Sequence, residues 1–397
     1  MNPELISHIK ERSLELQASV QKHREHLHMY PELSYQEYET MDFVAENLKR
    51  IGIPFTSGIG GTGIVGLIKA THHATDAPAI GLRADLDALP ITEENAVDYR
   101  SKKQGVMHAC GHDVHTAVLL GAAELLWELR EMLPHPVKLI FQPGEEKNPG
   151  GASLMIRDGV LQNPSILEMY ALHVFNDLEA GEAGFKEGIY MASCDEIHLT
   201  ILGKGGHGAT PHQCVDPIMI GANLLVQLQQ LVSRKCDPKI PCVLSFGHFE
   251  ALGATNIIPS KAHLKGTFRT MNEAWRKEAL ELIEKIIRST VEGHGGQVEL
   301  EISKGYPYLE NDPEVTSRMR STAQQLLGEN KVHDLPIRLT AEDFSFYSQE
   351  VPVCFFRLGT GNKAKGITYG VHHPRFDIDP DALHTGVALM TLAAFNR

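Results

Sequence analysis

The sequence lacks a long apolar run, a cysteine framework and a basic stretch. Its longest apolar segment, residues 118–127, is interrupted by Glu124 and is far shorter than the roughly 18 residues that a membrane span needs. Residues 1–28 are polar and lack the apolar core of a secretory signal. The formal net charge is −13 and no cluster of Lys and Arg is present, which argues against nucleic acid as a partner. We therefore expect neither a membrane segment nor a nucleic-acid site.

Cysteine is sparse, and no two cysteines form a CxxC pair. In a chain of 397 residues this distribution is typical of reduced thiols and predicts a cytoplasmic protein. Only Cys110 has neighbours of the metal-ligand type, and we expect the other five to be small core residues. The six positions are Cys110, Cys194, Cys214, Cys236, Cys242 and Cys354.

The length of the chain and its alternating patterns predict two domains, the first of them α/β. A chain of 397 residues exceeds the usual size of one hydrophobic core. In its first part helical and strand patterns alternate, which favours a mixed sheet flanked by helices. The expected helices are 3–28, 36–51 and 113–132, and the expected strands are 64–70, 79–83, 137–141 and 167–172.

The order of the elements changes after residue 195. The pattern there is strand, helix, strand, strand, helix, strand, which is typical of a ferredoxin-like (β-α-β-β-α-β) domain. We therefore predict an inserted domain at 187–303 and a first domain made of 1–186 and 304–397. The inserted elements are 197–202, 216–233, 243–250, 262–270, 273–292 and 297–303; helices at 313–327 and 379–396 and a strand at 353–358 follow.

The segment His108-Ala-Cys-Gly-His-Asp-Val-His115 is the strongest chemical signal in the chain. Cys110 and His112 flank a glycine, so a turn can direct both side chains at one centre. Thiolate sulfur and imidazole nitrogen are ligands that zinc prefers. The alternative is a hydrogen-bonded cluster of buried polar side chains at the start of a helix.

Three weaker signals supply further metal ligands. Glu145 and Glu146 follow the expected strand 137–141, and the carboxyl ends of strands are where α/β sheets gather their functional groups. His173 ends another strand. His372 and His373 precede a proline in an extended segment, so only one of them is expected to face the site. Each has a plain alternative: an acidic turn, a hydrogen-bonded strand end or an exposed loop.

Taken together, the motifs resemble those of the metal-dependent aminoacylase, hippurate hydrolase and auxin-conjugate amidohydrolase family, which is related to the zinc carboxypeptidases and aminoacylases. The resemblance runs the whole length of the chain. Its motifs are His28-Met-Tyr-Pro-Glu-Leu-Ser34, Arg83-Ala-Asp-Leu-Asp-Ala-Leu-Pro90, His108-Ala-Cys-Gly-His112, Gln142-Pro-Gly-Glu-Glu146, Gly205-Gly-His-Gly-Ala209, Asn256-Ile-Ile-Pro259, Gly266-Thr-Phe-Arg269, Glu342-Asp-Phe344 and His372-His-Pro374.

This resemblance implies two divalent metal ions per subunit, with zinc favoured and manganese, cobalt or nickel as alternatives. The implied metal ligands are Cys110 as the bridge, His112, Glu146, His173 and His372. Glu145 is implied as general base and acid. The residues alone do not decide which of Glu145 and Glu146 binds metal.

Further roles follow from the same resemblance. Asp85 would steer a ligand imidazole, although a turn or cap aspartate is an equal alternative. His207 would reach the active site of a partner subunit, which makes the inserted domain a lid and dimerisation domain and the protein a homodimer. Asn256 and Arg269 would hold the substrate's carboxylate, while a surface ion pair is the alternative for Arg269.

The chain departs from the family pattern at three positions. Gly144 stands where alanine is usual, and we expect only a looser turn. His373 stands where a small polar residue is commoner and so competes with His372 as ligand. Pro380 replaces an acidic residue, which we expect to matter only as a helix start.

The predicted activity is hydrolysis of the amide bond of an N-acyl amino acid, with an N-acetyl, N-benzoyl or similar acyl group, to a carboxylate and a free amino acid. A dipeptidase or aminopeptidase with the same two-metal site is the alternative. A non-catalytic metal-binding scaffold is a third, and the presence of Glu145 beside Glu146 speaks against it.

Overall fold

The chain forms two units in the computed structural model, which describes residues 1–71 and 77–397. The first unit comprises Met1–Tyr190, Glu310–Ile337 and Asp343–Arg397. The second comprises Met191–Leu309 and Arg338–Glu342. None of the helices in the described ranges combines the length and the apolar surface that crossing a bilayer requires.

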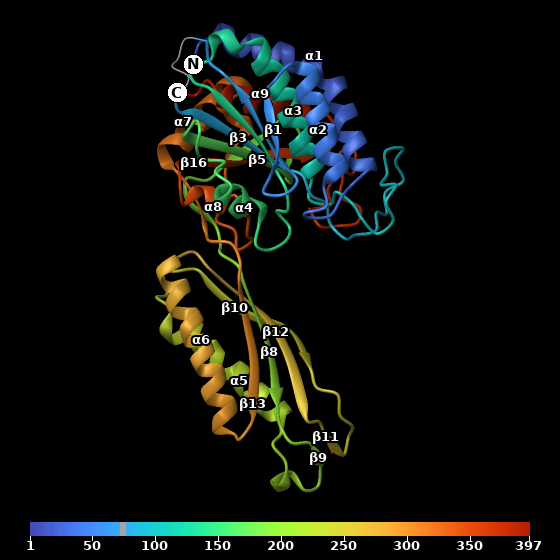
Figure 1. Ribbon diagram of the computed structural model, residues 1–397, viewed down its shortest axis with the longest axis vertical. Helices are drawn as coiled ribbons and strands as arrows, with labels where there is room; N and C mark the ends of the chain where they lie inside the picture. The colour runs from blue at the N-terminus through green and yellow to red at the C-terminus, as the bar shows by residue number, and fades with distance from the viewer. Residues whose placement is uncertain (72–76) are drawn as a thin grey trace. The chain divides into compact units, whose positions relative to one another are not determined.

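An eight-stranded mixed sheet is the framework of the first unit (Figure 1). Its strands lie in the order β1-β2-β4-β3-β5-β16-β6-β15. Four central neighbours, β4, β3, β5 and β16, run parallel, so their carboxyl ends meet at one edge of the sheet. The strands are β1 (Phe55–Ile59), β2 (Gly63–Ile68), β3 (Ala79–Asp85), β4 (Val137–Gln142), β5 (Ile166–Glu179), β6 (Ala183–Phe185), β15 (Val332–Asp334) and β16 (Val353–Gly361).

Helices cover both faces of this sheet. Five of them share one hydrophobic core with the sheet, in which Leu82 of β3 and Phe356 of β16 are fully buried. Two short helices, α4 and α8, lie on the other face, where Phe355 is buried. The helices are α1 (Pro3–Met29), α2 (Tyr38–Ile51), α3 (His112–Glu128), α7 (Pro313–Leu327) and α9 (Ala382–Ala393), then α4 (Gly151–Arg157) and α8 (Ser345–Ser348), with 3-10 turns at η1 (Arg130–Met132) and η4 (Glu329–Lys331).

The second unit has a four-stranded antiparallel sheet in the order β10-β12-β8-β13. Two helices, α5 and α6, pack on one face of it and close a separate hydrophobic core. Along the chain the elements are β8 (Asp195–Leu202), α5 (Pro217–Gln230), β10 (Cys242–Glu250), β12 (Lys261–Thr270), α6 (Glu273–Gly293) and β13 (Gln297–Lys304).

Smaller elements complete the fold. A two-stranded sheet in the second unit pairs β9 (Gly206–His207) with β11 (Ile257–Ile258). Another pairs β7 (Gly188–Met191) with β14 (Leu309–Asn311). The remaining turns are η2 (Pro211–Gln213) and η3 (Leu231–Lys235), the second of which continues α5 as a π-helical turn.

Three helices start with the same local signal. Asn2, Asp216 and Asp312 each accept a hydrogen bond from a backbone N–H of the first helical turn, and each is followed by a proline. The side chain satisfies an otherwise unpaired N–H, while proline loses nothing at a position where its missing donor is not needed. These pairs fix where α1, α5 and α7 begin.

Candidate metal centre

The candidate metal centre lies in the first unit, at the carboxyl ends of the central parallel strands. Asp85 ends β3, and Glu145 and Glu146 follow the end of β4. His173 lies in β5, and His112 is the first residue of α3. The sheet therefore brings together residues that are far apart in the sequence, at the edge where open α/β sheets bind ligands.

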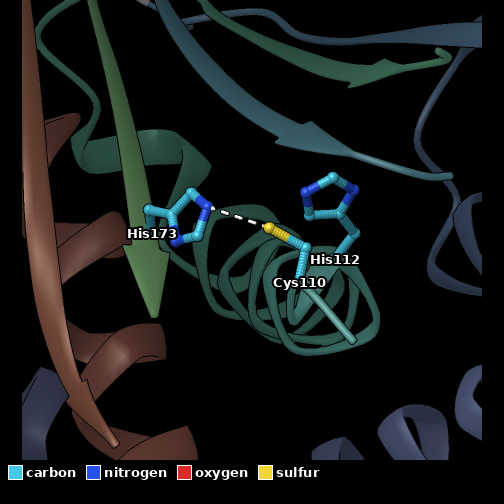
Figure 2. Close-up of side chains that lie close together, drawn as sticks. All are labelled: Cys110, His112 and His173. Carbon is cyan, nitrogen blue, oxygen red and sulfur yellow. Dashed lines mark hydrogen bonds between the residues drawn. The ribbon is translucent and has the colours of Figure 1, made fainter. Parts of the chain in front are cut away.

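Cys110 is the centre of this cluster. Its Sγ lies 3.5 Å from His173 Nε2. Figure 2 shows the sulfur between the imidazoles of His173, on β5, and His112, at the start of α3. The ligand atoms of Cys110, His112 and His173 lie within 4.8 Å of one another, and so do those of Cys110, Glu146 and His372. Two candidate ligand groups thus share one sulfur.

The turn at Gly111 makes this arrangement possible. Gly111 has φ +83°, and a Cβ there would meet the side chain of Val174. Only glycine adopts this conformation without strain and leaves the space that Val174 fills. Cys110 and His112 can therefore point at the same centre from the two sides of the turn.

The chemistry of the donor set fits divalent cations. Within the described residues, the buried atoms His112 Nε2 and Glu146 Oε1 have no hydrogen bond of acceptable geometry. Burial raises the pKa of the Cys110 thiol, and the carboxylates of Glu146 and Glu145 raise it further. Burial alone would lower the pKa of His112, but Asp85 and Asp87 raise it to about 10. Cations would relieve this concentration of negative charge and give these buried atoms a partner.

Asp87 has a role that the sequence did not reveal, since nothing in its motif distinguishes it from a turn residue. Its carboxylate accepts hydrogen bonds from Ser34 Oγ at 2.6 Å and from the backbone N–H groups of Glu145 at 3.1 Å and Glu146 at 2.9 Å. His112 Nδ1 lies 2.9 Å from its backbone oxygen and 3.2 Å from Oδ1. Asp87 therefore orients a candidate ligand and both glutamates.

Asp85 lies closest to the imidazole of His115, which is outside the predicted ligand set. Its Oδ1 lies 2.6 Å from His115 Nδ1, and its Oδ2 accepts a hydrogen bond from Arg83 at 2.6 Å. His112 Nε2 is farther away, at 3.6 Å from Oδ2. Burial alone would raise the pKa of Asp85, but the charge of Arg83, with smaller contributions from His112 and His115, holds it well below its usual range.

Glu145 and Glu146 occupy different surroundings. Glu145 is buried, and its Oε1 accepts a long hydrogen bond of 3.4 Å from the backbone N–H of Asp343. Its Oε2 lies 3.9 Å from His112 Nε2. Glu146 Oε1 instead lies 3.1 Å from His372 Nε2. Glu146 thus faces the second histidine segment, while Glu145 lies beside the first.

The structure distinguishes the two adjacent histidines. His372 has a left-handed backbone with φ +67°, donates its N–H to Ala109 O at 2.7 Å and belongs to a candidate ligand group. His373 stacks on Tyr369 with a ring-centroid distance of 4.2 Å. The turn between them therefore brings only His372 into the cluster.

Gly144 does more than loosen a turn. It has φ +57°, and the ring of Tyr35 occupies the place that a Cβ would take. The Tyr35 hydroxyl donates a hydrogen bond to Lys147 O at 2.6 Å and accepts one from the N–H of Gly150 at 3.1 Å. The glycine thus admits an aromatic side chain that fixes the loop after Glu146, which corrects the expectation from the sequence.

The other predicted site residues lie in the second unit. His207 is exposed and pairs with Ile257, next to Asn256, in the small sheet of β9 and β11. Arg269 lies in β12 and donates to Leu339 O at 3.0 Å. This hydrogen bond thus goes to a backbone carbonyl and not to the carboxylate of a surface ion pair.

Comparisons with known proteins find similar sequences over most of the chain. The model of peptidase family M20/M25/M40 matches residues 81–396. The chain is 38% identical over 371 residues to the putative amidohydrolase YhaA of Bacillus subtilis, covering 94% of this chain and 92% of that protein. It is 40% identical over 303 residues to an N-acyl-L-amino acid amidohydrolase of Geobacillus stearothermophilus, covering 75% and 80%.

A solved structure is also similar over nearly the whole chain. It is the Bacillus subtilis YXEP protein, described as a dinuclear metal-binding peptidase of the M20 family. The TM-score is 0.80 and the identity 31%, over 96% of this chain and 98% of that one.

Proposed function

The chain belongs to peptidase family M20/M25/M40, and from this premise we propose that it is a metal-dependent hydrolase that cleaves the amide bond of N-acyl amino acids. One observation carries the proposal. Thiol, imidazole and carboxylate groups converge around Cys110, with the additional carboxylate of Glu145 beside them. The similarity to an N-acyl-L-amino acid amidohydrolase supports the substrate class.

Five residues would hold two divalent cations: Cys110, His112, Glu146, His173 and His372. Zinc suits the thiolate and imidazole donors, and manganese, cobalt or nickel suit the set as well. When bound, such ions lower the pKa of water toward neutrality and polarise a carbonyl oxygen. The similarity to a dinuclear metal-binding peptidase supports the number of ions.

Glu145 would move the proton. Its buried carboxylate takes a proton from the water whose oxygen attacks the amide carbon, and returns it to the nitrogen as the carbon–nitrogen bond breaks. The products are a carboxylate and a free amino acid. Asp87 and the N–H of Asp343 keep Glu145 in place for both transfers.

The proposal is tested by amino acid release from hippurate and from N-acetyl, N-benzoyl and indole-acetyl amino acids, with and without a chelator. We expect release that the chelator abolishes and added Zn²⁺ restores. Preference for dipeptides with a free α-amine over blocked substrates would instead favour the peptidase alternative. Release that is insensitive to the chelator would contradict the metal-dependent mechanism.

For the second unit we propose a ferredoxin-like lid and dimerisation domain, predicted at 187–303, with 1–186 and 304–397 as the catalytic domain. Its strand and helix order fits that motif. β10 is an edge strand of its sheet. On α5 the apolar side chains of Met219 and Val226 are 65% and 68% exposed, and Leu252, just after β10, is 82% exposed. An open strand edge and an apolar helix suit pairing with a second copy of the chain.

In this homodimer His207 would reach the partner's active site and donate a hydrogen bond to the substrate or developing oxyanion, while Asn256 and Arg269 hold the substrate carboxylate. Mixing two inactive variants, His207→Ala and Glu145→Gln, should restore partial activity. Each mixed dimer then has one site with an intact Glu145 and an intact partner histidine. Absence of any recovery, in dimers shown to exchange subunits, would place His207 in its own subunit's site.

We further propose a cytoplasmic location. Six free cysteines without a disulfide among the described residues suit a reducing compartment.

A further inference from the structure

A buried ion-pair network centred on Arg24 adjoins the candidate metal centre, and the proposed chemistry does not use it. Arg24 lies in α1 and is 2% exposed. Its Nε donates to Asp113 Oδ2 at 2.8 Å, and one terminal nitrogen donates to Asp377 Oδ1 at 2.9 Å. A single guanidinium therefore joins two acidic residues that are far apart in the sequence, and all three lie in the first unit.

The first carboxylate belongs to the segment that carries Cys110 and His112. Asp113 directly follows His112 in the first turn of α3. Its Oδ2 also lies 2.7 Å from His28 Nδ1, and His28 Nε2 lies 3.2 Å from Glu93. Arg24 and His28, both of α1, thus fix the start of α3 from one side.

The second carboxylate belongs to the loop that carries His372. Asp377 also accepts a hydrogen bond from the Tyr99 hydroxyl at 2.8 Å, and its backbone oxygen accepts one from Asn176 at 2.9 Å. The side chain of His372 itself is 54% exposed, so little packing holds it. Its place depends on the backbone of its loop, which is anchored at Asp377 and at the hydrogen bond to Ala109, and also where Pro374 O and Phe376 O accept hydrogen bonds from Glu94 and Asn95.

We propose that Arg24 is a positioning residue that sets the distance between the segment carrying Cys110 and His112 and the loop carrying His372, and so controls the affinity of the metal site to which His372 contributes. The inference rests on the proposed function, in which His372 is a ligand. A planar guanidinium offers donors in a fixed fork and holds two carboxylates at a defined spacing. A lysine ammonium in its place keeps the charge but not the fork.

Loss of the Arg24 network should affect one metal site more than the other, because the two candidate ligand groups are held in different ways. The Cys110, His112 and His173 group consists of buried side chains held by the turn at Gly111, by Asp87 and by β5. The Cys110, Glu146 and His372 group depends on a loop whose hydrogen-bonded links to the first segment, among the described residues, are the Ala109 bond and the Arg24 bridge. Loss of the bridge therefore affects the second group more than the first.

The test is calorimetric titration of Zn²⁺ into metal-free protein, for the wild type, Arg24→Lys and Asp377→Asn. Asp377→Asn removes the charge of the loop and leaves the pair of Arg24 and Asp113 intact. We expect both variants to lose about ten-fold or more in affinity at one of two sites and less than about two-fold at the other. The matched control is Arg12→Lys, since Arg12 also joins α1 to α3, through Glu128, but at the exposed surface.

Three results would overturn the inference. Both affinities could stay at the wild-type values while the melting temperature falls, which is what a purely structural role predicts. Both could fall equally, which indicates general loosening. If Arg24→Lys and Asp377→Asn do not fold, Tyr99→Phe takes their place, because it removes only one hydrogen bond to Asp377. Unchanged Zn²⁺ affinities in Tyr99→Phe would be the third result against the inference. A wild-type protein that binds fewer than two ions would instead refute the proposed function, and the inference with it.

Discussion

Glu145 and Glu146 are neighbours in the sequence, and their surroundings differ. Glu145 is buried beside His112 and the N–H of Asp343, whereas Glu146 faces His372. The residue types around Cys110 could be predicted from the sequence because their chemistry is unusual. The assignment within the glutamate pair stays a prediction; the difference in surroundings could not be read from the sequence, because it depends on Asp343 and His372, which lie elsewhere in the chain.

Replacement of the proposed proton carrier should separate metal binding from turnover. Glu145→Gln keeps the size of the side chain and removes its ability to accept a proton. We expect both ions to remain and kcat to fall by about two to four orders of magnitude. Metal content by elemental analysis and kcat with an N-acetyl amino acid check this, and near-normal turnover would remove Glu145 from the mechanism.

Replacement of the proposed bridging sulfur should weaken metal retention. Cys110→Ser substitutes a hydroxyl that does not ionise as a thiol does, so we expect metal content after dialysis to fall below that of the wild type. Cys354→Ser is the control, because Cys354 is a buried thiol in the same unit and lies outside the candidate ligand groups. Equal metal content in Cys110→Ser and the wild type would exclude the sulfur as a ligand.

Replacement of Gly144 by alanine should destabilise this chain. The φ of +57° is unfavourable for alanine by about 1–2 kcal/mol, and the Tyr35 ring must move as well. Urea unfolding of Gly144→Ala should show the loss. The double variant with Tyr35→Ala should recover the part that is due to crowding, and no recovery would mean that backbone strain alone is responsible.

At the scale of elements, long periodic helices were predicted well and short elements were missed. The helices expected at 3–28 and 273–292 agree with α1 and α6 within one residue. The last helix was expected at 379–396, but α9 is shorter and spans Ala382–Ala393, so that it begins after Pro380. The helices α4 and α8 went unpredicted because so few residues carry no periodic pattern and their place is set by packing against the sheet.

One buried side chain in β4 should be needed for the stability of the first unit. Lys138 donates hydrogen bonds to the backbone oxygens of Val160, Gln162 and Pro164 at 2.7, 2.7 and 2.8 Å. Lys138→Met leaves these acceptors without their donor, and we expect the free energy of unfolding to fall by about 1–3 kcal/mol. Denaturant unfolding measures this, with the exposed Lys69→Met as control. A loss no larger than that of the control would show that water replaces the ammonium group.

At the scale of the molecule, the family and its activity follow from motifs that run along the whole chain. The resemblance inferred from those motifs is confirmed by the family match over residues 81–396. The mixed sheet with flanking helices was also predicted correctly. The homodimer implied by the resemblance stays a prediction, and local patterns add little to it, because an exposed apolar residue on a helix looks the same in the sequence as a buried one.

A charge on the exposed face of α5 should separate the proposed homodimer. Val226 is 68% exposed, so Val226→Glu costs the isolated unit little, while in an interface it buries an unpaired carboxylate. We expect monomers in sedimentation velocity experiments and reduced activity, because His207 no longer reaches a partner. Lys285→Glu, on the exposed side of α6, is the control. A dimer that survives Val226→Glu would place the interface elsewhere.

The unequal burial of the histidines has a kinetic consequence. His112 and His173 are 0% and 6% exposed, whereas the side chain of His372 is 54% exposed. A cation held partly by His372 would exchange with the solvent without any opening of the fold, and its companion beside the interior imidazoles would exchange only when the protein fluctuates. Preparations washed with a mild chelator should therefore pass through a half-loaded stage, in which the inner ion remains after the outer one has left.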